Sequence, residues 1–251
     1  MTYAWVLGKR ALLEAWRTPE ALLPTLFIPL FFLAVNVGQA ARIFPSGSTA
    51  FLHGQGYGAF QLPSSMLLAA SFGSAALFLV EEIEGGYFDK LRATPVPRSA
   101  IILGRLIAEG VKSLLIASLI VVLGLIFGIS IASGVFGFLL LILLAAGWAV
   151  VYGGYMQIIA LKTRSAAATN SAGLVFFPLL FLTPNFVPRN LLTHPMEVAA
   201  TINPVTYLME AMRSLILEDF HWETILLGYL VVAVAGVFMV VISGRVIRNY
   251  D

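Results

Sequence analysis

Few residues in this chain have the types and spacing needed for chemistry. The sequence has no cysteine, which excludes a thiol nucleophile, a disulfide and a thiolate metal site. Its three histidines, His53, His194 and His221, are scattered and share no metal-ligand spacing. The pattern GxxxxGK[ST], whose backbone and lysine hold nucleotide phosphates, does not occur. We therefore expect no catalytic residue, no metal site and no cofactor bound by this chain.

Charge is concentrated in one segment, residues 81–98, with the sequence EEIEGGYFDKLRATPVPR between long apolar stretches. Its Gly-Gly pair and its Thr-Pro-Val-Pro run favour a short helix held on a shaped loop. We interpret this segment as the surface at which the protein meets a soluble partner. The alternative is an ordinary solvated loop whose charges only fix the topology.

The elements that must position this segment are membrane helices. Of the 251 residues, 59% are hydrophobic and 11% are charged, against about 25% charged residues in a soluble domain. Apolar stretches of about 20 residues, the length that crosses a bilayer, predict spans at 21–40, 59–80, 110–131, 135–160, 166–184 and 223–244. The sequence thus predicts an all-α polytopic membrane protein with six transmembrane helices in a single domain, residues 1–251.

Basic residues give the orientation, because their excess marks the cytoplasmic side of a membrane protein. With the N-terminus inside, only Arg42, Arg189 and Arg213 of the 15 Lys and Arg residues lie on the outer face. We expect both termini to be cytoplasmic, in a plasma or inner membrane. The formal net charge of +2 is too small to indicate nucleic-acid binding.

Two segments outside the spans have their own character. Residues 1–20 combine Trp5 and Trp16 with basic residues, which is typical of a helix lying in the inner interface. Residues 185–222 are too polar to cross lipid and too apolar to lie free in water. We expect this segment to form one or two re-entrant helices at the outer face, packed against protein.

Within the outer segment, the residues around 202–213 predict a helix start. Asn203 is the expected N-cap and Pro204 the first helical residue. Glu210 and Arg213 are spaced i, i+3 and could pair with each other. A structural role for this segment is favoured over contact with a substrate.

Three motifs in order along the chain resemble those of ATP-binding-cassette type 2 (ABC-2) permeases. The run E-x-E-x-G-x-x-D-x-L-x-x-T-P-V at 82–96, followed by Gly104-Arg105, is similar to that family's cytoplasmic E-x-E-x-G-T-x-E-x-L-x-x-T-P-V motif with its Gly-Lys pair. The stretches FFPLLFLTPNFVP at 176–188 and INPVTYLMEAMR at 202–213 resemble the family's fifth span end and outer re-entrant segment. The likeness is strongest to drug-resistance membrane subunits of the daunorubicin-exporter type. Tyr87 and Asp89 depart from the family's usual Thr and Glu.

The resemblance implies the membrane subunit of an ATP-driven exporter for a hydrophobic or amphipathic molecule, such as a drug, lipid or glycolipid. Two permease copies, forming a homodimer in the membrane, would sit above two separate ATPase subunits that bind ATP and Mg²⁺. ATP binding would push on a coupling helix in the cytoplasmic segment 81–100. The residues expected to dock the ATPase are Gly86, Tyr87, Phe88, Asp89, Lys90, Leu91, Arg92 and Pro95. Tyr87, Phe88 and Leu91 would be the apolar contacts in an ATPase groove.

Two further groups of residues are candidates for function. Glu82 and Glu84, at the inner end of the second span, could form ion pairs with Arg98, Arg105 or Lys112, or with the interfacial helix, or could simply be solvated. Aromatic residues of the first and fifth spans could line an apolar substrate path, although a phenylalanine in a span is usually lipid-facing or packed. These residues are Phe27, Phe31, Phe176, Phe177 and Phe181.

Three other functions compete with drug or lipid export. A polysaccharide or lipid-linked glycan permease belongs to the same superfamily. An intramembrane enzyme would need convergent polar residues, for which His194, Glu197 and His221 in the 185–222 segment are the only loose candidates. A passive channel would need a polar stripe lining a pore, and the predicted spans lack one.

Overall fold

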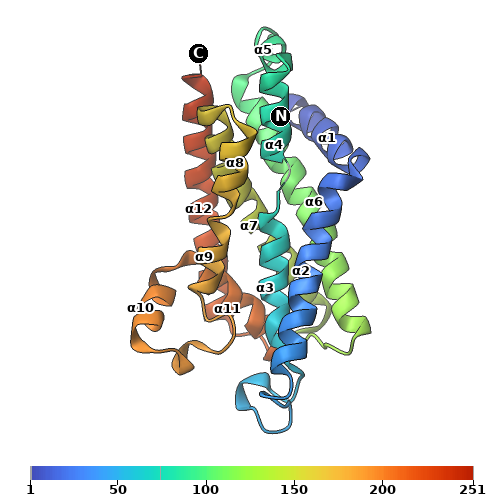
Figure 1. The fold of residues 1–251 in the computed structure, drawn as a ribbon, viewed down its shortest axis with the longest axis vertical. Helices are drawn as coiled ribbons and strands as arrows, with labels where there is room; N and C mark the ends of the chain where they lie inside the picture. Colours follow the sequence, from blue (N-terminus) through green and yellow to red (C-terminus); the bar gives the residue numbers. More distant parts are fainter. Residues whose placement is uncertain (1, 74, 251) are drawn as a thin grey trace.

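The computed structural model describes residues 2–73 and 75–250, and helices make up most of this part. The predicted all-α class is confirmed, with no strand among the described residues. The helices are α1 Thr2–Arg17, α2 Pro19–Ala40, α3 Tyr57–Ser71, α4 Ala75–Glu84, α5 Tyr87–Arg92, α6 Arg98–Ile126, α7 Gly134–Thr163, α8 Ala166–Gly173, α9 Phe176–Phe181, α10 His194–Ile202, α11 Pro204–Leu217 and α12 Trp222–Arg248. The bundle is elongated, with α1, α5 and the end of α12 at one end and α10 at the other (Figure 1).

Five helical segments of the described chain are long and apolar enough to cross a membrane. They are Leu22–Ala40, Tyr57–Glu84, Arg98–Ile126, Gly134–Thr163 and Trp222–Arg248. The span predicted at 166–184 is instead two short helices, α8 and α9, separated at residues 174–175. The count of six spans therefore stays a prediction.

One predicted boundary was wrong, because α6 is one continuous helix from Arg98 to Ile126 rather than a span at 110–131. The second span, predicted at 59–80, lies within the apolar segment Tyr57–Glu84 but is interrupted at residues 72–73, between α3 and α4. The hydrophobic pattern could not place the start of α6, because its first turns carry charged side chains that are buried against other helices. Arg105, Glu109 and Lys112 are each less than 5% exposed.

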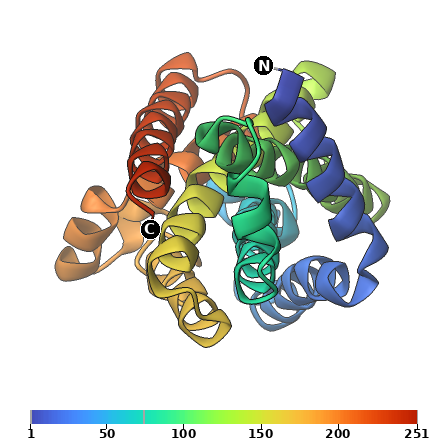
Figure 2. The same ribbon diagram turned by 90° about the horizontal axis from the view of Figure 1, so that it is seen from above.

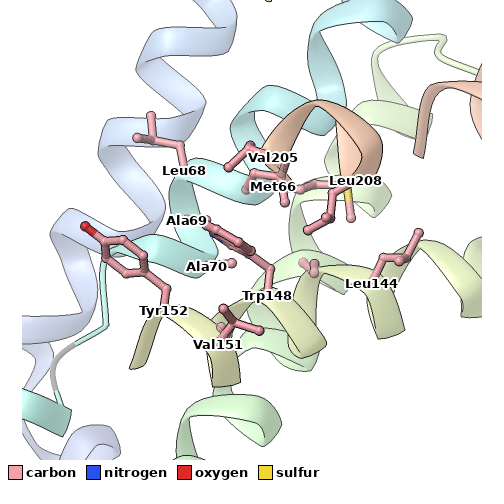
Figure 3. Close-up of a cluster of buried hydrophobic side chains, with 14 of the residues drawn as sticks. Met66, Leu68, Ala69, Ala70, Leu144, Trp148, Val151, Tyr152, Val205 and Leu208 are labelled. Carbon is pink, nitrogen blue, oxygen red and sulfur yellow. The ribbon is translucent and has the colours of Figure 1, made fainter. Parts of the chain in front are cut away.

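The core lies where α3, α7 and α11 meet (Figure 3). Trp148 of α7 extends its indole toward α3, and its Nε1 donates to Ser71 Oγ at 2.8 Å. Met66 and Leu208 pack beside it from α3 and α11. The polar residues of α3 likewise face protein: Gln61 Nε2 donates to the Asn185 carbonyl at 2.9 Å. Because Gln61, Ser64 and Ser65 are fully buried against protein rather than exposed to lipid, α3 can cross the membrane despite them.

The N-terminal helix α1 lies against the inner part of α6, as Figure 2 shows from above. A Cβ added to Gly104 would lie 2.9 Å from the Ala4 carbonyl oxygen and 2.9 Å from the Gly8 nitrogen. The two glycines thus allow the backbones of α1 and α6 to touch. Trp5 and Trp16 are 61% and 60% exposed and do not pack into the bundle. A position of α1 in the membrane interface stays a prediction.

The outer segment contains α10 and the largely buried α11. Asn203 caps α11 as predicted, accepting a 3.0 Å hydrogen bond from Val205 N, and Pro204 is the first helical residue. The predicted pair of Glu210 with Arg213 was wrong, because Glu210 pairs with Arg189 at 2.9 Å.

Arg213 is buried beneath this segment. Its guanidinium donates to the carbonyl oxygens of Phe60, Pro184 and Asn185 and lies 3.5 Å above the Phe60 ring. Three carbonyl oxygens thus accept hydrogen bonds from the guanidinium of a residue that is only 7% exposed. Arg213 therefore fastens α11 to α3 and to the loop after α9.

Candidate coupling site at the end of the bundle

The candidate site is built around α5, the six-residue helix in the charged segment. Gly86 precedes it with φ of 70°, a left-handed conformation that favours glycine and turns the chain sharply after α4. Asp89 and Arg92 form an i, i+3 ion pair at 3.2 Å along α5. Pro97 directly precedes α6. The predicted short helix on a shaped loop is therefore present, at the same end of the bundle as α1 and the end of α12 (Figure 1).

Only some of the residues predicted to dock the ATPase are exposed on α5 and the loop after it. Tyr87 is 42% exposed, and the Asp89 and Lys90 side chains are also exposed. Leu91 is half-buried and Pro95 is exposed. These side chains form the outer surface of the site.

The prediction that Phe88 is an outward contact was wrong, because this side chain is 0% exposed. Its ring meets the Tyr250 ring edge-to-face, with centroids 5.1 Å apart. In a six-residue helix one face must pack against the bundle, and the sequence alone did not show which aromatic side chain occupies that face.

Tyr250, after the end of α12, is a residue that sequence reasoning missed. Its ring lies between two guanidinium groups, those of Arg92 at 4.6 Å and Arg164 at 4.3 Å. Arg92 also donates a hydrogen bond to the Tyr250 carbonyl oxygen. Cation–π and hydrogen-bond contacts thus connect α5 to the ends of both α12 and α7. The sequence feature that could have pointed to Tyr250 is its place just after the last turn of α12, which carries Arg245 and Arg248.

A second connection runs from α4 to α1 and α6 through Glu82, which is 7% exposed. Its carboxylate pairs with Arg105, a predicted partner, and with Arg10 of the interfacial helix at 2.5 Å. The Arg10 guanidinium also lies 4.3 Å from the centre of the Tyr87 ring. One buried carboxylate therefore holds together the helices that surround α5.

The other predicted inner-face residues do not join this network. Glu84 is exposed, and the described part of the chain contains no ion pair to it. Arg98 donates to the Arg248 carbonyl oxygen at 3.1 Å. That bond again joins the start of α6 to the end of α12.

The break between α3 and α4 is stabilised by charged side chains of α6. Glu109 Oε1 accepts from Ala75 N at 2.8 Å, and Arg105 Nη1 donates to the Ala75 carbonyl oxygen at 3.1 Å. Glu109 in turn pairs with Lys112 at 2.8 Å. These side chains take the place of backbone partners that an interrupted helix lacks.

Glu109 and Lys112 lie near one end of the membrane-crossing part of α6. Counting about 20 residues back from the end of α6 at Ile126, the length of a bilayer span, reaches roughly residue 107. Both residues therefore lie in the first two turns of that span, where they are buried and paired with each other.

The aromatic residues proposed for a substrate path do not form one surface. Phe27 and Phe31 stack on each other, 5.9 Å between centroids, on the exposed face of α2. Phe176 is 2% exposed and packs beside Trp148, so it belongs to the core.

The remaining two predicted path residues are spaced i, i+4 along α9. Phe177 is half-buried with its ring edge-to-face against Phe72, and Phe181 is 41% exposed. The prediction of one aromatic path was therefore wrong, because these residues lie on separate surfaces. Which of them are buried depends on which helices are neighbours, and the sequence alone does not show that.

A different feature provides a hollow of suitable size. A cavity of about 500 Å³ lies between α2, α8 and the break at residues 72–73. Its lining mixes apolar side chains such as Leu77 and Met156 with polar ones such as Thr25 and Asn170. Polar side chains at membrane depth usually face a water-filled cavity or protein.

No cluster of histidine and acidic residues suitable for a metal ion occurs in the described part of the chain. His53 and His221 both lie 3.2 Å from the Glu218 carboxylate, which links the loop before α3 to the turn before α12. The loose His194, Glu197 and His221 group considered for an enzyme is thus not assembled around one point.

Two comparisons with known proteins agree with this arrangement. A family model described as "ABC-2 type transporter" matches residues 2–217. The daunorubicin resistance ABC transporter permease protein DrrB1 of Streptomyces coeruleorubidus is 24% identical over 220 residues, covering 86% of this chain and 74% of that relative. Because the family model covers most of a membrane protein with this helical architecture, the chain belongs to the ABC-2 type transporter family and is a membrane transport subunit.

Proposed function

We propose that this chain is the permease subunit of an exporter powered by a separate ATPase that docks on α5. The observation that carries the proposal is an exposed short helix, held by Gly86 at the end of an interrupted span and presenting Tyr87, Asp89 and Lys90 outward. ATP and Mg²⁺ would bind to the partner subunit, and this chain would hold no cofactor.

The contacts behind α5 give a route for its movement into the membrane. A push on α5 would act through Glu82 on α6 and α1, and through Tyr250 on α12 and α7. The break between α3 and α4 would let the inner part of the second span tilt while α3 stays packed in the core. Binding of ATP by the partner would thereby favour one of two packings of the bundle.

We further propose that the substrate is an amphipathic molecule that enters the cavity beside this break. The lining of the cavity combines polar side chains, among them Glu20, with apolar ones, and about 500 Å³ lies within the usual size range of small-molecule sites. The relative's name refers to resistance to daunorubicin, which supports a drug-like substrate. Two permease copies would assemble as a homodimer.

Co-purification tests the docking. The tagged protein is extracted from its native membrane in mild detergent, and the proteins recovered with it are identified by mass spectrometry. We expect a stoichiometric soluble ATPase with the unaltered chain and its loss on Tyr87→Ala combined with Lys90→Glu. Arg42→Gln, a charge change at the opposite end of the bundle, is the matched control and should retain the ATPase. Equal recovery with all three proteins would refute docking on α5.

The orientation is tested by labelling. Because the chain has no cysteine, Ser46→Cys and Ser99→Cys each introduce one thiol, and both serines are exposed. With both termini cytoplasmic, a membrane-impermeant thiol reagent added outside should label only the cysteine at position 46. Labelling of position 99 instead would reverse the topology.

A further inference from the structure

A basic cavity lies at the coupling end of the bundle, where the ends of α7 and α12 meet. Its volume is about 420 Å³, and Lys162, Arg164 and Arg245 are the charged residues that line it. No Asp or Glu lines it in the part of the chain that the structure describes. We propose that this cavity binds the headgroup of an anionic phospholipid of the inner leaflet.

The charges of the cavity suit an anion. Lys162 and Arg245 are exposed, and neither has a carboxylate within ion-pair distance among residues 2–73 and 75–250. A place in the last turn of a helix favours each cation individually through the helix dipole. The dipole does not account for their convergence on one hollow, where a bound anion would relieve the repulsion between like charges.

The position of the cavity identifies that anion as part of a lipid. Lys162 and Arg245 each lie in the last turn of a helix long enough to cross the membrane. Such residues lie at headgroup level, and basic pockets between spans on the cytoplasmic side suit anionic headgroups. Leu161 and Val246 provide the apolar wall of the cavity.

An exposed apolar stripe leads from the membrane to the cavity. Val234, Phe238 and Val241 of α12 are 62%, 59% and 45% exposed, and their spacing places them on one helix face with Arg245. Acyl chains would lie along this stripe while the phosphate sits between Lys162 and Arg245. A soluble anion would use the cavity but gain nothing from the stripe.

The test compares lipid compositions on the full chain. The protein is reconstituted into nanodiscs of phosphatidylcholine, with or without phosphatidylglycerol, and its Tm is measured. We expect phosphatidylglycerol to raise the Tm of the unaltered chain and to have little effect on Lys162→Gln combined with Arg245→Gln. The exchange Lys162→Arg with Arg245→Lys keeps both charges and should retain the shift, which separates charge from a packing defect.

A matched control excludes general attraction to the membrane. Lys9→Gln combined with Arg17→Gln removes the same charge from exposed positions of α1 and should keep most of the shift. An equal loss in this control would overturn the proposal, as would a shift that survives in the double variant at the cavity. If inorganic phosphate stabilised the protein in phosphatidylcholine as well as phosphatidylglycerol does, the lipid would be the wrong occupant. If Lys162→Gln combined with Arg245→Gln kept the Tm shift caused by phosphatidylglycerol but lost the co-purifying ATPase, the cavity would be an ATPase contact and not a lipid site.

Discussion

Replacing Glu82 by Gln should loosen the helices that surround α5 while leaving the outer half of the bundle intact. The carboxylate pairs with Arg105, which is 4% exposed, and with Arg10, whose side chain is 40% exposed. Removing one partner of a buried pair costs roughly 3–5 kcal/mol because the remaining charge is left unpaired. The solvent-screened pair with Arg10 adds less than about 1 kcal/mol.

These energies predict a clear thermal shift. At about 2–4 °C per kcal/mol for a chain of this size, Glu82→Gln should lower the Tm in nanodiscs by on the order of 10 °C. Glu81→Gln is the matched control, since Glu81 is the adjacent residue, is exposed and has no ion pair among the described residues. We expect this control to change the Tm by no more than about 2 °C, in line with surface substitutions.

The comparison has a defined failure. Equal Tm values for the two variants would mean that the Glu82 pair is solvated in the membrane-bound protein, and the coupling route through α6 and α1 would be wrong. The further substitution Arg105→Met in the Glu82→Gln background should recover part of the loss, because it removes the unpaired buried charge. No recovery would show that the loss comes from packing rather than charge.

Three further predictions follow from the same region. Phe88→Ala should lower the stability of the fold by about 3–5 kcal/mol, because it removes a buried phenylalanine ring. Tyr87→Ala should leave the Tm nearly unchanged but abolish co-purification of the ATPase. Equal Tm losses in the two variants would contradict the assignment of the buried and exposed faces of α5. Gly104→Ala should lower the Tm by an amount equivalent to about 1–3 kcal/mol through overpacking, because the new Cβ meets the α1 backbone at 2.9 Å. The control Gly244→Ala, whose new Cβ has no atom within 4 Å, should leave the Tm unchanged. Similar Tm values for the two variants would show that α1 does not touch α6. Burial raises the pKa of the Glu14 carboxyl, and Arg105 opposes this shift. The contribution of Glu14 to stability is therefore present at low pH and lost as pH rises through its folded-state pKa. Glu14→Gln should raise the Tm at neutral pH but not in acid, and a Tm gain independent of pH would exclude the raised pKa as its cause.

Much of the architecture could be predicted from local pattern. Runs of about 20 apolar residues located most of the long helices, and turn chemistry located α5 and the start of α11. Asn203 and Pro204 cap a helix through atoms close to them in sequence, so that prediction needed no tertiary information. The prediction failed where a helix is interrupted inside the membrane, since the hydrophobic pattern runs on across residues 72–74.

The candidate site was predictable in composition but not in orientation. The sequence indicated a docking helix within residues 81–100, yet it assigned Phe88 to the outside and omitted Tyr250. Which face of a short helix is buried depends on a partner that lies 162 positions further along the chain. Glu210 likewise pairs with Arg189 and not with Arg213 at i+3, because the Arg213 side chain points inward and donates to three carbonyl oxygens.

By itself the sequence determined that this chain resides in a membrane, that a charged segment connects two of its spans, and that the nucleotide-binding pattern GxxxxGK[ST] does not occur in it. Those conclusions depend on composition and on spacing within about one helix length. Only the tertiary structure decided that Glu82 joins three helices, that Glu109 and Arg105 support a broken span, and that Tyr250 fastens α5. Each of these contacts is between residues far apart in sequence, where burial makes an unpaired charge or polar group costly and thereby selects one partner.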